Sequence, residues 1–143
     1  MTAEDVRTFS EQYARAWERG DIDALVACYT DDCEVVSPIF NVVSGKSQLA
    51  ASFRELFRAF SDYMVEIDDV IVDRSRDERA VLLFTTFGVH KGEMFGVQGT
   101  GRRFEVRGAF VFTFENGKIA KDTRIYDFTG MLMQLGILRA KAS

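Results

Sequence analysis

The dipeptide Asn116-Gly117, which stands between two alternating apolar runs, constrains the fold more than any other feature of the sequence. Both residues tolerate the positive φ that a two-residue hairpin turn requires, so the dipeptide predicts a tight turn between two strands. The flanking runs, Phe104 to Glu115 and Lys118 to Tyr126, predict those strands. A turn or two of helix is expected after them, over Met131 to Leu138. The last third of the sequence therefore predicts a long hairpin and a short closing helix.

The N-terminal part of the chain contains three stretches with helical spacing of apolar residues. Thr2 is expected to cap the first helix and Gly20 to end it, Asp21 to cap a short second helix, and Gly45 to precede a third. The apolar stripe of the first helix is Val6, Phe9, Tyr13, Ala16 and Trp17, and that of the third is Leu49, Phe53, Leu56, Phe57 and Phe60.

Elsewhere the apolar period is two, which predicts strands. The expected strands are Cys33 to Ser37, which is halted by Pro38, Tyr63 to Val72, and Ala80 to Val89. The expected breaks are the polar segment 29–32, the charged segment 73–78, and the glycine-rich segment 92–101. We interpret the glycine-rich segment as a hairpin or a flap at a pocket entrance.

Helices first and long strands afterwards are typical of the α+β class. We expect a cone-shaped, curved antiparallel sheet wrapped around the three N-terminal helices, with a short C-terminal helix and an apolar pocket between sheet and helices. The length of 143 residues and the lack of a linker predict one domain over residues 1–143. Thirteen Phe residues indicate either a large aromatic core or an apolar cavity.

Composition excludes several classes of function. The net charge of −4 argues against a nucleic-acid binder. We expect no membrane span, because no apolar run approaches about 18 residues, and no secretory signal, because the N-terminus is acidic. The spacing of Cys28 and Cys33, together with the single His, argues against a metal site. Both thiols are expected to be reduced, as in a cytoplasmic protein.

A set of short motifs resembles the nuclear-transport-factor-2-like superfamily and, within it, the SnoaL-like group that includes polyketide cyclases. The motifs, in order, are Gly20-Asp21, Tyr29-Thr30-Asp31-Asp32, Pro38, Gly45, Gly101-Arg102-Arg103, Gly117-Lys118-Ile119, Tyr126-Asp127 and Gln134-Leu135-Gly136. The resemblance covers nearly the whole chain. It implies a small-molecule pocket, no cofactor, and frequently a homodimer. Members of the superfamily include cyclases, isomerases, hydrolases, dehydratases and non-catalytic binders, so the fold alone does not decide the function.

The resemblance also implies positions for functional residues. Ketosteroid isomerases of the superfamily use a tyrosine and two aspartates, and these positions fall on Tyr13, Ser37 and Phe110. SnoaL-like cyclases and limonene-epoxide-type hydrolases carry an acid/base aspartate on the last strand, and this position falls on Arg124. A guanidinium holds its protons too tightly to act as a general acid, but it can bind an enolate or a carboxylate.

Alternation along the last strand places Asp122, Arg124 and Tyr126 on one face. If this face points into the pocket, it offers an acid, a cation and a phenol. The alternative is a structural ion pair at the pocket mouth. Asp127, which ends the strand, is either a displaced acid/base or the cap of the closing helix.

His90 is the sole imidazole and the best single base candidate, because its unperturbed pKa is near neutral. The alternative is a surface histidine or a buried one with its hydrogen bonds satisfied. Tyr13 is either an oxyanion donor or a core aromatic residue. The aromatic side chains expected to contact a substrate, besides Tyr126, are Trp17, Phe53, Phe57 and Phe110.

Two hypotheses follow. The first is a cofactor-free enzyme that moves protons on an apolar carbonyl compound, as in cyclisation or isomerisation. His90 or Asp122 would be the acid/base, and Tyr13, Arg124 and Tyr126 would bind the oxyanion. The second is a non-catalytic ligand-binding or dimerising module, in which alternate Phe residues of the penultimate strand line either the pocket or a dimer face (Phe110, Phe112 and Phe114).

Overall fold

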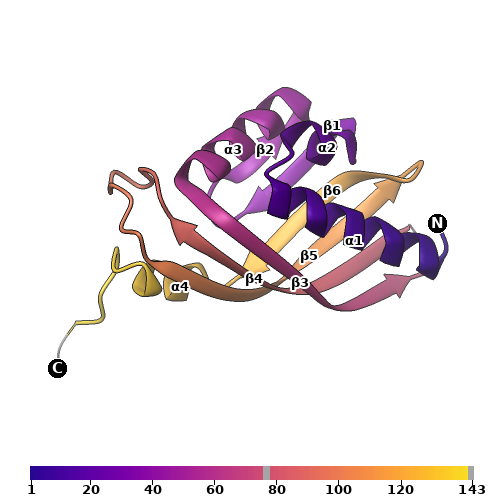
Figure 1. The fold of residues 1–143 in the computed structure, drawn as a ribbon. Coiled ribbons are helices and arrows are strands. Elements are labelled where there is room, and N and C mark those ends of the chain that lie inside the picture. The colour runs from indigo at the N-terminus through magenta and orange to yellow at the C-terminus, as the bar shows by residue number, and fades with distance from the viewer. Residues whose placement is uncertain (76–77, 142–143) are drawn as a thin grey trace.

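A computed structural model describes residues 1–75 and 78–141 (Figure 1). Its elements are α1 (Ala3–Arg19), α2 (Ile22–Ala27), β1 (Tyr29–Ser37), β2 (Asn41–Ser44), α3 (Gly45–Ala59), β3 (Phe60–Asp73), β4 (Arg79–His90), β5 (Arg103–Glu115), β6 (Lys118–Tyr126) and α4 (Phe128–Gln134). The predicted α+β order is confirmed.

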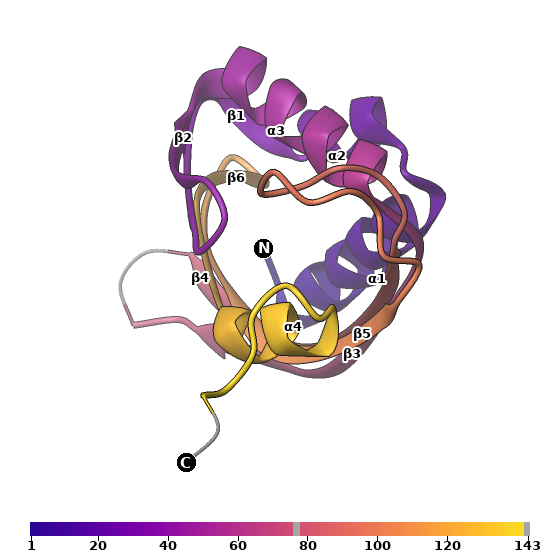
Figure 2. The same cartoon turned by 90° about the vertical axis from the view of Figure 1, so that its left-hand side faces the viewer.

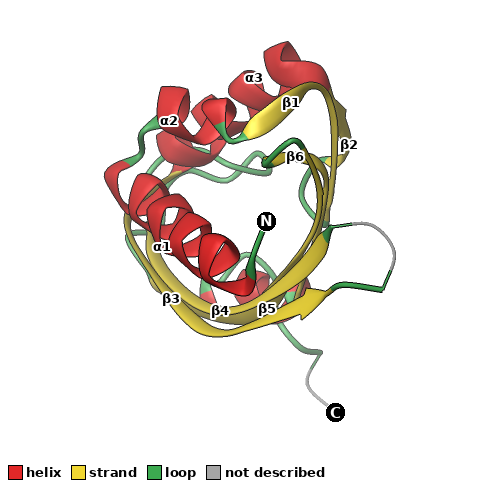
Figure 3. Ribbon diagram, turned by 90° about the vertical axis from the view of Figure 1, so that its right-hand side faces the viewer, coloured by secondary structure: helices red, strands yellow, loops and turns green. Residues whose placement is uncertain are grey.

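The strands form one strongly curved, six-stranded sheet in the order β2-β1-β6-β5-β4-β3. Figure 2 shows the sheet curled around an interior, with α1 and α3 along its open side and α4 across the near end. Figure 3 shows the opposite end, where α1 begins. The sheet is mixed rather than wholly antiparallel, because β1 and β6 pair in parallel. The last strand of a chain can pair with the first in either the parallel or the antiparallel direction. Short-range sequence patterns do not determine which of the two directions occurs.

The helix α1 is anchored at both its start and its C-terminal half. Thr2 and Asp5 form a capping box, in which each side chain accepts a hydrogen bond from the other residue's backbone N–H (3.0 and 2.8 Å). Farther along, Arg15 Nη2 donates to the carbonyl of Val65 (2.6 Å), and the N–H of Val65 donates to Glu18 (2.9 Å). The helix thereby satisfies backbone groups on β3, which is an edge strand of the sheet.

The hairpin prediction is confirmed. Asn116 and Gly117 have φ values of 51° and 76°, and they join β5 to β6. The three alternate Phe residues of β5 (Phe110, Phe112 and Phe114) point into the interior and are buried. They serve the core and the pocket, and not an outer dimer face.

Several boundaries differ from the sequence predictions. Residues 29–32 belong to β1, because Tyr29 pairs with Ile119 and a bulge absorbs the polar residues that follow. The short strand β2 was not expected, and it forms where the chain turns back after Pro38. The helix α4 starts at Phe128 because Asp127 caps it there. The strand β3 starts at Phe60, directly after α3. The predicted break 73–78 includes two residues, 76 and 77, that lie outside the described part of the chain.

Cys28 and Cys33 are both free thiols in the structure. Cys28 is partly buried and donates to the carbonyl of Ala24 (3.3 Å), and Cys33 is buried. Within the described ranges, every helix is too short or too polar to cross a bilayer.

Candidate functional site

A largely apolar pocket occupies one end of the interior. Its walls come from the inward faces of β3 to β6, and further parts come from α1, α3, the turn between β1 and β2, and α4. The cavity volume is about 70 Å³. Its mostly aromatic and aliphatic walls, with a few polar groups among them, are typical of a small-molecule site. The polar side chains among its lining are Ser37, Thr86, Tyr63, Tyr126, Trp17 and Arg124.

Of the described residues that line this pocket, Arg124 alone carries a charge. Its Nε donates to Asp122 Oδ2 across 3.0 Å, and their side chains are 6% and 0% exposed. Both residues lie on β6 and point inward, because successive inward positions of a strand are two residues apart. Arg124 lines the pocket, whereas Asp122 does not.

Two tyrosine hydroxyls complete a buried network around this ion pair. Tyr29 donates to Asp122 Oδ2 (2.8 Å) and accepts from Arg124 Nη2 (3.3 Å). The hydroxyl of Tyr13 lies 2.5 Å from that of Tyr29. The guanidinium of Arg124 also sits 5.4 to 5.8 Å from the ring centres of three aromatic side chains, which favours the cation. Those rings are Trp17, Phe53 and Phe110.

Burial governs the electrostatics of the site. It raises the pKa of Asp122, and Arg124 and Tyr29 offset only part of that rise. Burial opposes the charge of Arg124, yet Asp122 holds the pKa of the guanidinium well above its ordinary value. Asp122 Oδ1 is buried and has no hydrogen-bond partner among the described residues.

The two tyrosines that line the pocket are hydrogen-bond donors at neutral pH. Burial raises the pKa of Tyr126 to about 12, with Arg124 opposing the shift. Burial also raises the pKa of Tyr63, and the neighbouring Tyr126 adds to this effect. Neither phenol can therefore act as a base near neutral pH.

The structure brings together most of the residues that the sequence singled out. Tyr13, Asp122 and Arg124 share the buried network, and Trp17, Phe110 and Tyr126 line the pocket. Phe53 and Phe57 pack against Trp17 at 5.3 and 5.5 Å, outside the lining.

Sequence reasoning missed Tyr29 and Tyr63 as site residues. Tyr29 lies in a segment whose composition predicts a polar break, and Tyr63 lies at the start of a predicted strand. The inward alternation of β1 (Cys33, Val35, Ser37), continued back by four residues, could have pointed to Tyr29, although a bulge lies between Tyr29 and Glu34.

His90 lies away from the network, at the end of β4, and is fully buried. Its Nδ1 accepts from the N–H of Thr100 (3.3 Å) and lies 3.1 Å from the Thr100 hydroxyl. Its Nε2 has no partner among the described residues. The ring lies 5.6 Å from that of Phe60, which lines the pocket, but His90 itself does not.

The glycine-rich segment packs closely on the end of α3. A Cβ at Gly92 would lie 2.3 Å from the carbonyl oxygen of Arg58, and one at Gly99 would lie 1.9 Å from that of Lys91. Only glycine permits such approaches. The segment makes one short bridge, Met94 with Val97, and so resembles a tight turn more than a long hairpin.

Asp127 caps α4. Its Oδ1 accepts from the N–H of Gly130 at 2.8 Å, and the residue is exposed and does not line the pocket. Of its two predicted roles, capping is the one that this geometry supports.

Comparison with known proteins gives a consistent match to one family. The model of the SnoaL-like polyketide cyclase family matches residues 7–135. A search of curated proteins found no match.

Many solved structures share the fold. TsrD from Streptomyces laurentii is 27% identical, with a TM-score of 0.82, over 96% of this chain and 99% of that one. A protein of ketosteroid isomerase-like fold from Catenulispora acidiphila, solved with trimethylamine, is 20% identical, with a TM-score of 0.76, over 96% of each chain. An LEH-like epoxide hydrolase from M. tuberculosis is 19% identical, with a TM-score of 0.71, over 94% of this chain and 90% of that one.

Replacement of the α4 cap provides a test of the role of Asp127. We expect Asp127→Ala to lower the free energy of unfolding by about 1 kcal/mol, because the N–H of Gly130 loses its acceptor. Asp127→Ser, which can still cap, should retain most of the stability. Chemical denaturation measures both variants. An alanine variant of unchanged stability would contradict the capping role.

The pH dependence of stability reports on Asp122. Because burial raises its pKa above the ordinary value of 3.8, the folded protein keeps a proton there at pH values where the unfolded chain has lost it. The stability from this group is fully present below the unfolded-state pKa and is lost as the pH rises through the folded-state pKa. In urea titrations at acid pH, the stability of the wild type relative to Asp122→Asn should fall as the pH rises. A relative gain with rising pH would mean that Arg124 dominates and lowers the pKa of Asp122.

Proposed function

The chain belongs to the SnoaL-like polyketide cyclase family, and from this we propose that it is a cofactor-free enzyme acting on an apolar, carbonyl-bearing small molecule. Its chemistry would be proton transfer of the cyclase or isomerase type, with an enolate formed and stabilised in the pocket. The observation that carries the proposal is the position of Arg124, a buried cation facing an otherwise uncharged, largely aromatic cavity.

Each residue of the site has a distinct role in this proposal. Arg124 would bind the oxygen on which negative charge develops, and the phenols of Tyr63 and Tyr126 would offer further hydrogen bonds. A donor fixed in a site that excludes water stabilises such an oxyanion more than water does. Asp122 would be a positioning residue, because its contact with Arg124 Nε fixes the plane of the guanidinium.

The acid/base roles predicted for His90 and Asp122 have less support. Neither residue lines the pocket, so each would need a relay to reach a bound molecule. This observation favours a second candidate function, in which the pocket binds its ligand without turning it over. The two candidates differ in one measurable respect, which is whether the protein accelerates exchange of the protons next to a bound carbonyl.

Replacement of Arg124 tests the enzymatic proposal. Ligands are first found by thermal shift with steroids, hydroxyanthraquinones, terpene epoxides and small keto acids. For a carbonyl ligand, Arg124→Met should slow exchange of its α-protons into D₂O by about 10²–10³-fold, the usual effect of losing an oxyanion donor. Arg54→Met, at an exposed position on α3, is the matched control and should exchange at the wild-type rate.

If the wild type binds a carbonyl ligand without accelerating exchange, the non-catalytic candidate replaces the enzymatic one. If it accelerates exchange and Arg124→Met does so equally well, Arg124 is not the oxyanion donor. The variants His90→Gln and Asp122→Asn, measured in the same assay, would identify a proton relay by a loss of at least about 10²-fold.

We also propose that the protein is a homodimer that pairs through the outer face of its sheet. Strand register places one side-chain row across all six strands on that face, with members Ile71, Val81, Val111, Thr123, Val36 and Val42. A second row joins Leu83, Ala109 and Ile125. Large parts of these rows are exposed, with Ile125 at 58% and Val42 at 56%. A contiguous exposed apolar surface of this kind is typical of an interface.

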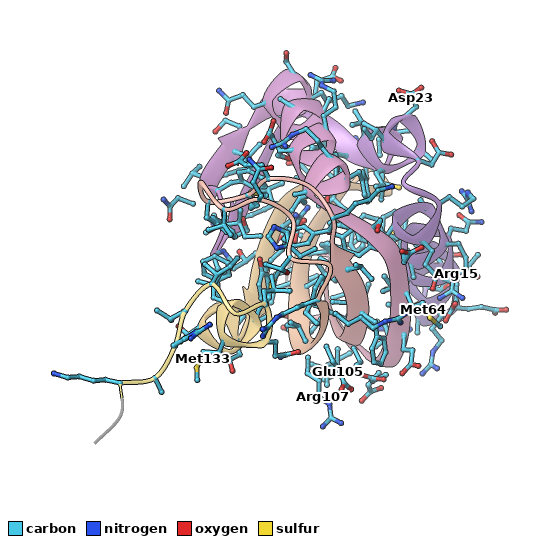
Figure 4. All side chains as sticks on the ribbon, turned by 60° about the vertical axis from the view of Figure 1, so that its left-hand side comes forward. Arg15, Asp23, Met64, Glu105, Arg107 and Met133 are labelled. Carbon is cyan, nitrogen blue, oxygen red and sulfur yellow. The ribbon has the colours of Figure 1, made fainter. Side chains whose placement is uncertain are left out.

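Charges at the margins of this face suit a two-fold partner. Glu105 and Arg107 of β5 project away from the body of the protein, as does Met64 of β3 (Figure 4). Acidic and basic side chains on one strand can meet their opposites when a second copy lies across it. The partner that fits is therefore another copy of this chain.

A charge in the apolar rows should separate the protomers. We expect Ile125→Lys to convert the dimer to a monomer in sedimentation velocity, because a lysine would be buried against the second copy. Met133→Lys, on α4 and away from the rows, is the control, since Met133 is comparably exposed at 45%. A wild-type protein that sediments only as a monomer would rule out the dimer.

A further inference from the structure

We propose that the pocket binds its ligand in the ionised form, as an oxyanion seated on Arg124, and that it therefore selects acidic carbonyl compounds and phenols. The class comprises β-diketones and hydroxyarenes, which lose a proton without a strong base. This inference rests on the proposed function and specifies its substrate class. The proton released on ionisation goes to water at the pocket mouth.

The first step concerns the hydrogen-bond capacity of Arg124. A guanidinium carries five N–H donors. The structure uses one at Nε for Asp122 and one at Nη2 for Tyr29. The remaining donors have no hydrogen-bond partner among the described residues, and the side chain lines the pocket. These unused donors make a ready site for an anionic oxygen.

The ion pair presents its positive partner, Arg124, to the pocket. Asp122 is fully buried and absent from the pocket lining, whereas Arg124 reaches the cavity. A ligand in the pocket therefore lies nearer the positive end of the pair than the negative end. Because the Coulomb energy falls with distance, the nearer positive charge outweighs the farther negative one for such a ligand. The pair attracts an anion although its net charge is zero.

The third step is the lack of a base in the cavity. Among the described lining residues there is no carboxylate, imidazole or lysine, and the phenols there stay protonated at neutral pH. A ligand that ionises must give its proton to water. The O–H bond of the enol or phenol breaks, its electron pair stays on the oxygen beside Arg124, and the proton leaves as hydronium or on buffer.

The fourth step is shape. The rings of Phe84 and Phe110 are stacked with their centres 4.5 Å apart, and Phe60 and Phe104 meet edge to face at 5.5 Å. All four rings line the cavity. Such walls favour a flat, delocalised molecule. An enolate or phenolate conjugated with a ring meets both requirements, because its charge sits at one oxygen-bearing edge.

The test uses the ultraviolet spectra of two probes, benzoylacetone and naphthol, since each absorbs differently when ionised. Each is titrated with the wild-type protein over a range of pH, and the pKa of the bound probe is compared with that of the free probe. We expect the pKa of the bound probe to lie about 1 to 3 below that of the free probe, as it does for an acid beside a close cation. The ionised form then binds about tenfold or more tightly than the neutral form. Benzoylacetone dimethylated at its central carbon, which cannot form the acidic enol of the β-diketone, should bind correspondingly more weakly.

Three variants locate the effect. Arg124→Met should abolish the preference for the ionised form, and Arg54→Met should leave it unchanged. Asp122→Asn should keep or strengthen it, because the carboxylate that competes for Arg124 is gone. A loss of ionisation in Asp122→Asn would overturn the proposal, since it would assign the proton to Asp122. The wild-type comparison with the dimethylated probe decides the matter even if a buried variant does not fold.

The proposal is also overturned if both probes bind in their neutral form, or if neither binds. These failures are distinct from failure of the proposed function. Acceleration of α-proton exchange in a neutral carbonyl ligand would preserve the enzyme and refute oxyanion selection. Tight binding of oxyanions without exchange would preserve the selection and refute the enzyme.

Discussion

The buried ion pair between Asp122 and Arg124 is the interaction on which the rest of the structure depends. Two charges taken out of water cost several kcal/mol each, and only good geometry with additional hydrogen bonds offsets that cost. Here the offset comes from Tyr29, from Tyr13 behind it, and from the rings around the guanidinium. The loss of either ionic partner would leave the other uncompensated, at about 3–5 kcal/mol. The packing of α1, β1 and β6 against one another is therefore tied to the chemistry of the pocket.

The two faces of the sheet have different roles. Inward positions of β4 and β5 hold aromatic residues that form both the core and the pocket wall, so one set of residues serves stability and binding. Outward positions form the apolar rows that we assign to a second copy. Because the two functions occupy opposite faces of the same strands, a residue can change on one face without direct contact with the other.

Patterns of short range predicted most of the architecture. The Asn116-Gly117 turn, the α1 cap and the shared face of Asp122, Arg124 and Tyr126 could be predicted because each depends on residues within a few positions of one another. Which face of β6 points inward could not be predicted in this way. The parallel pairing of β1 with β6, the strand β2 and the role of Tyr29 could not. They depend on contacts between residues far apart in sequence, such as Tyr29 with Asp122. His90 illustrates the same limit, because its burial beside Thr100 is set by how the glycine-rich segment folds back.

The parallel pairing has a consequence for how the protein is made. β6 lies between β1 and β5, so the strand synthesised last among the six is inserted next to the first. Tyr29 and Asp122 are 93 positions apart, and loops of that length close slowly. On the ribosome, Tyr13 of α1 and Tyr29 of β1 therefore lack the carboxylate of Asp122 until β6 emerges. The nascent chain is exposed to aggregation and to chaperones during that interval, and the pocket is among the last features to form.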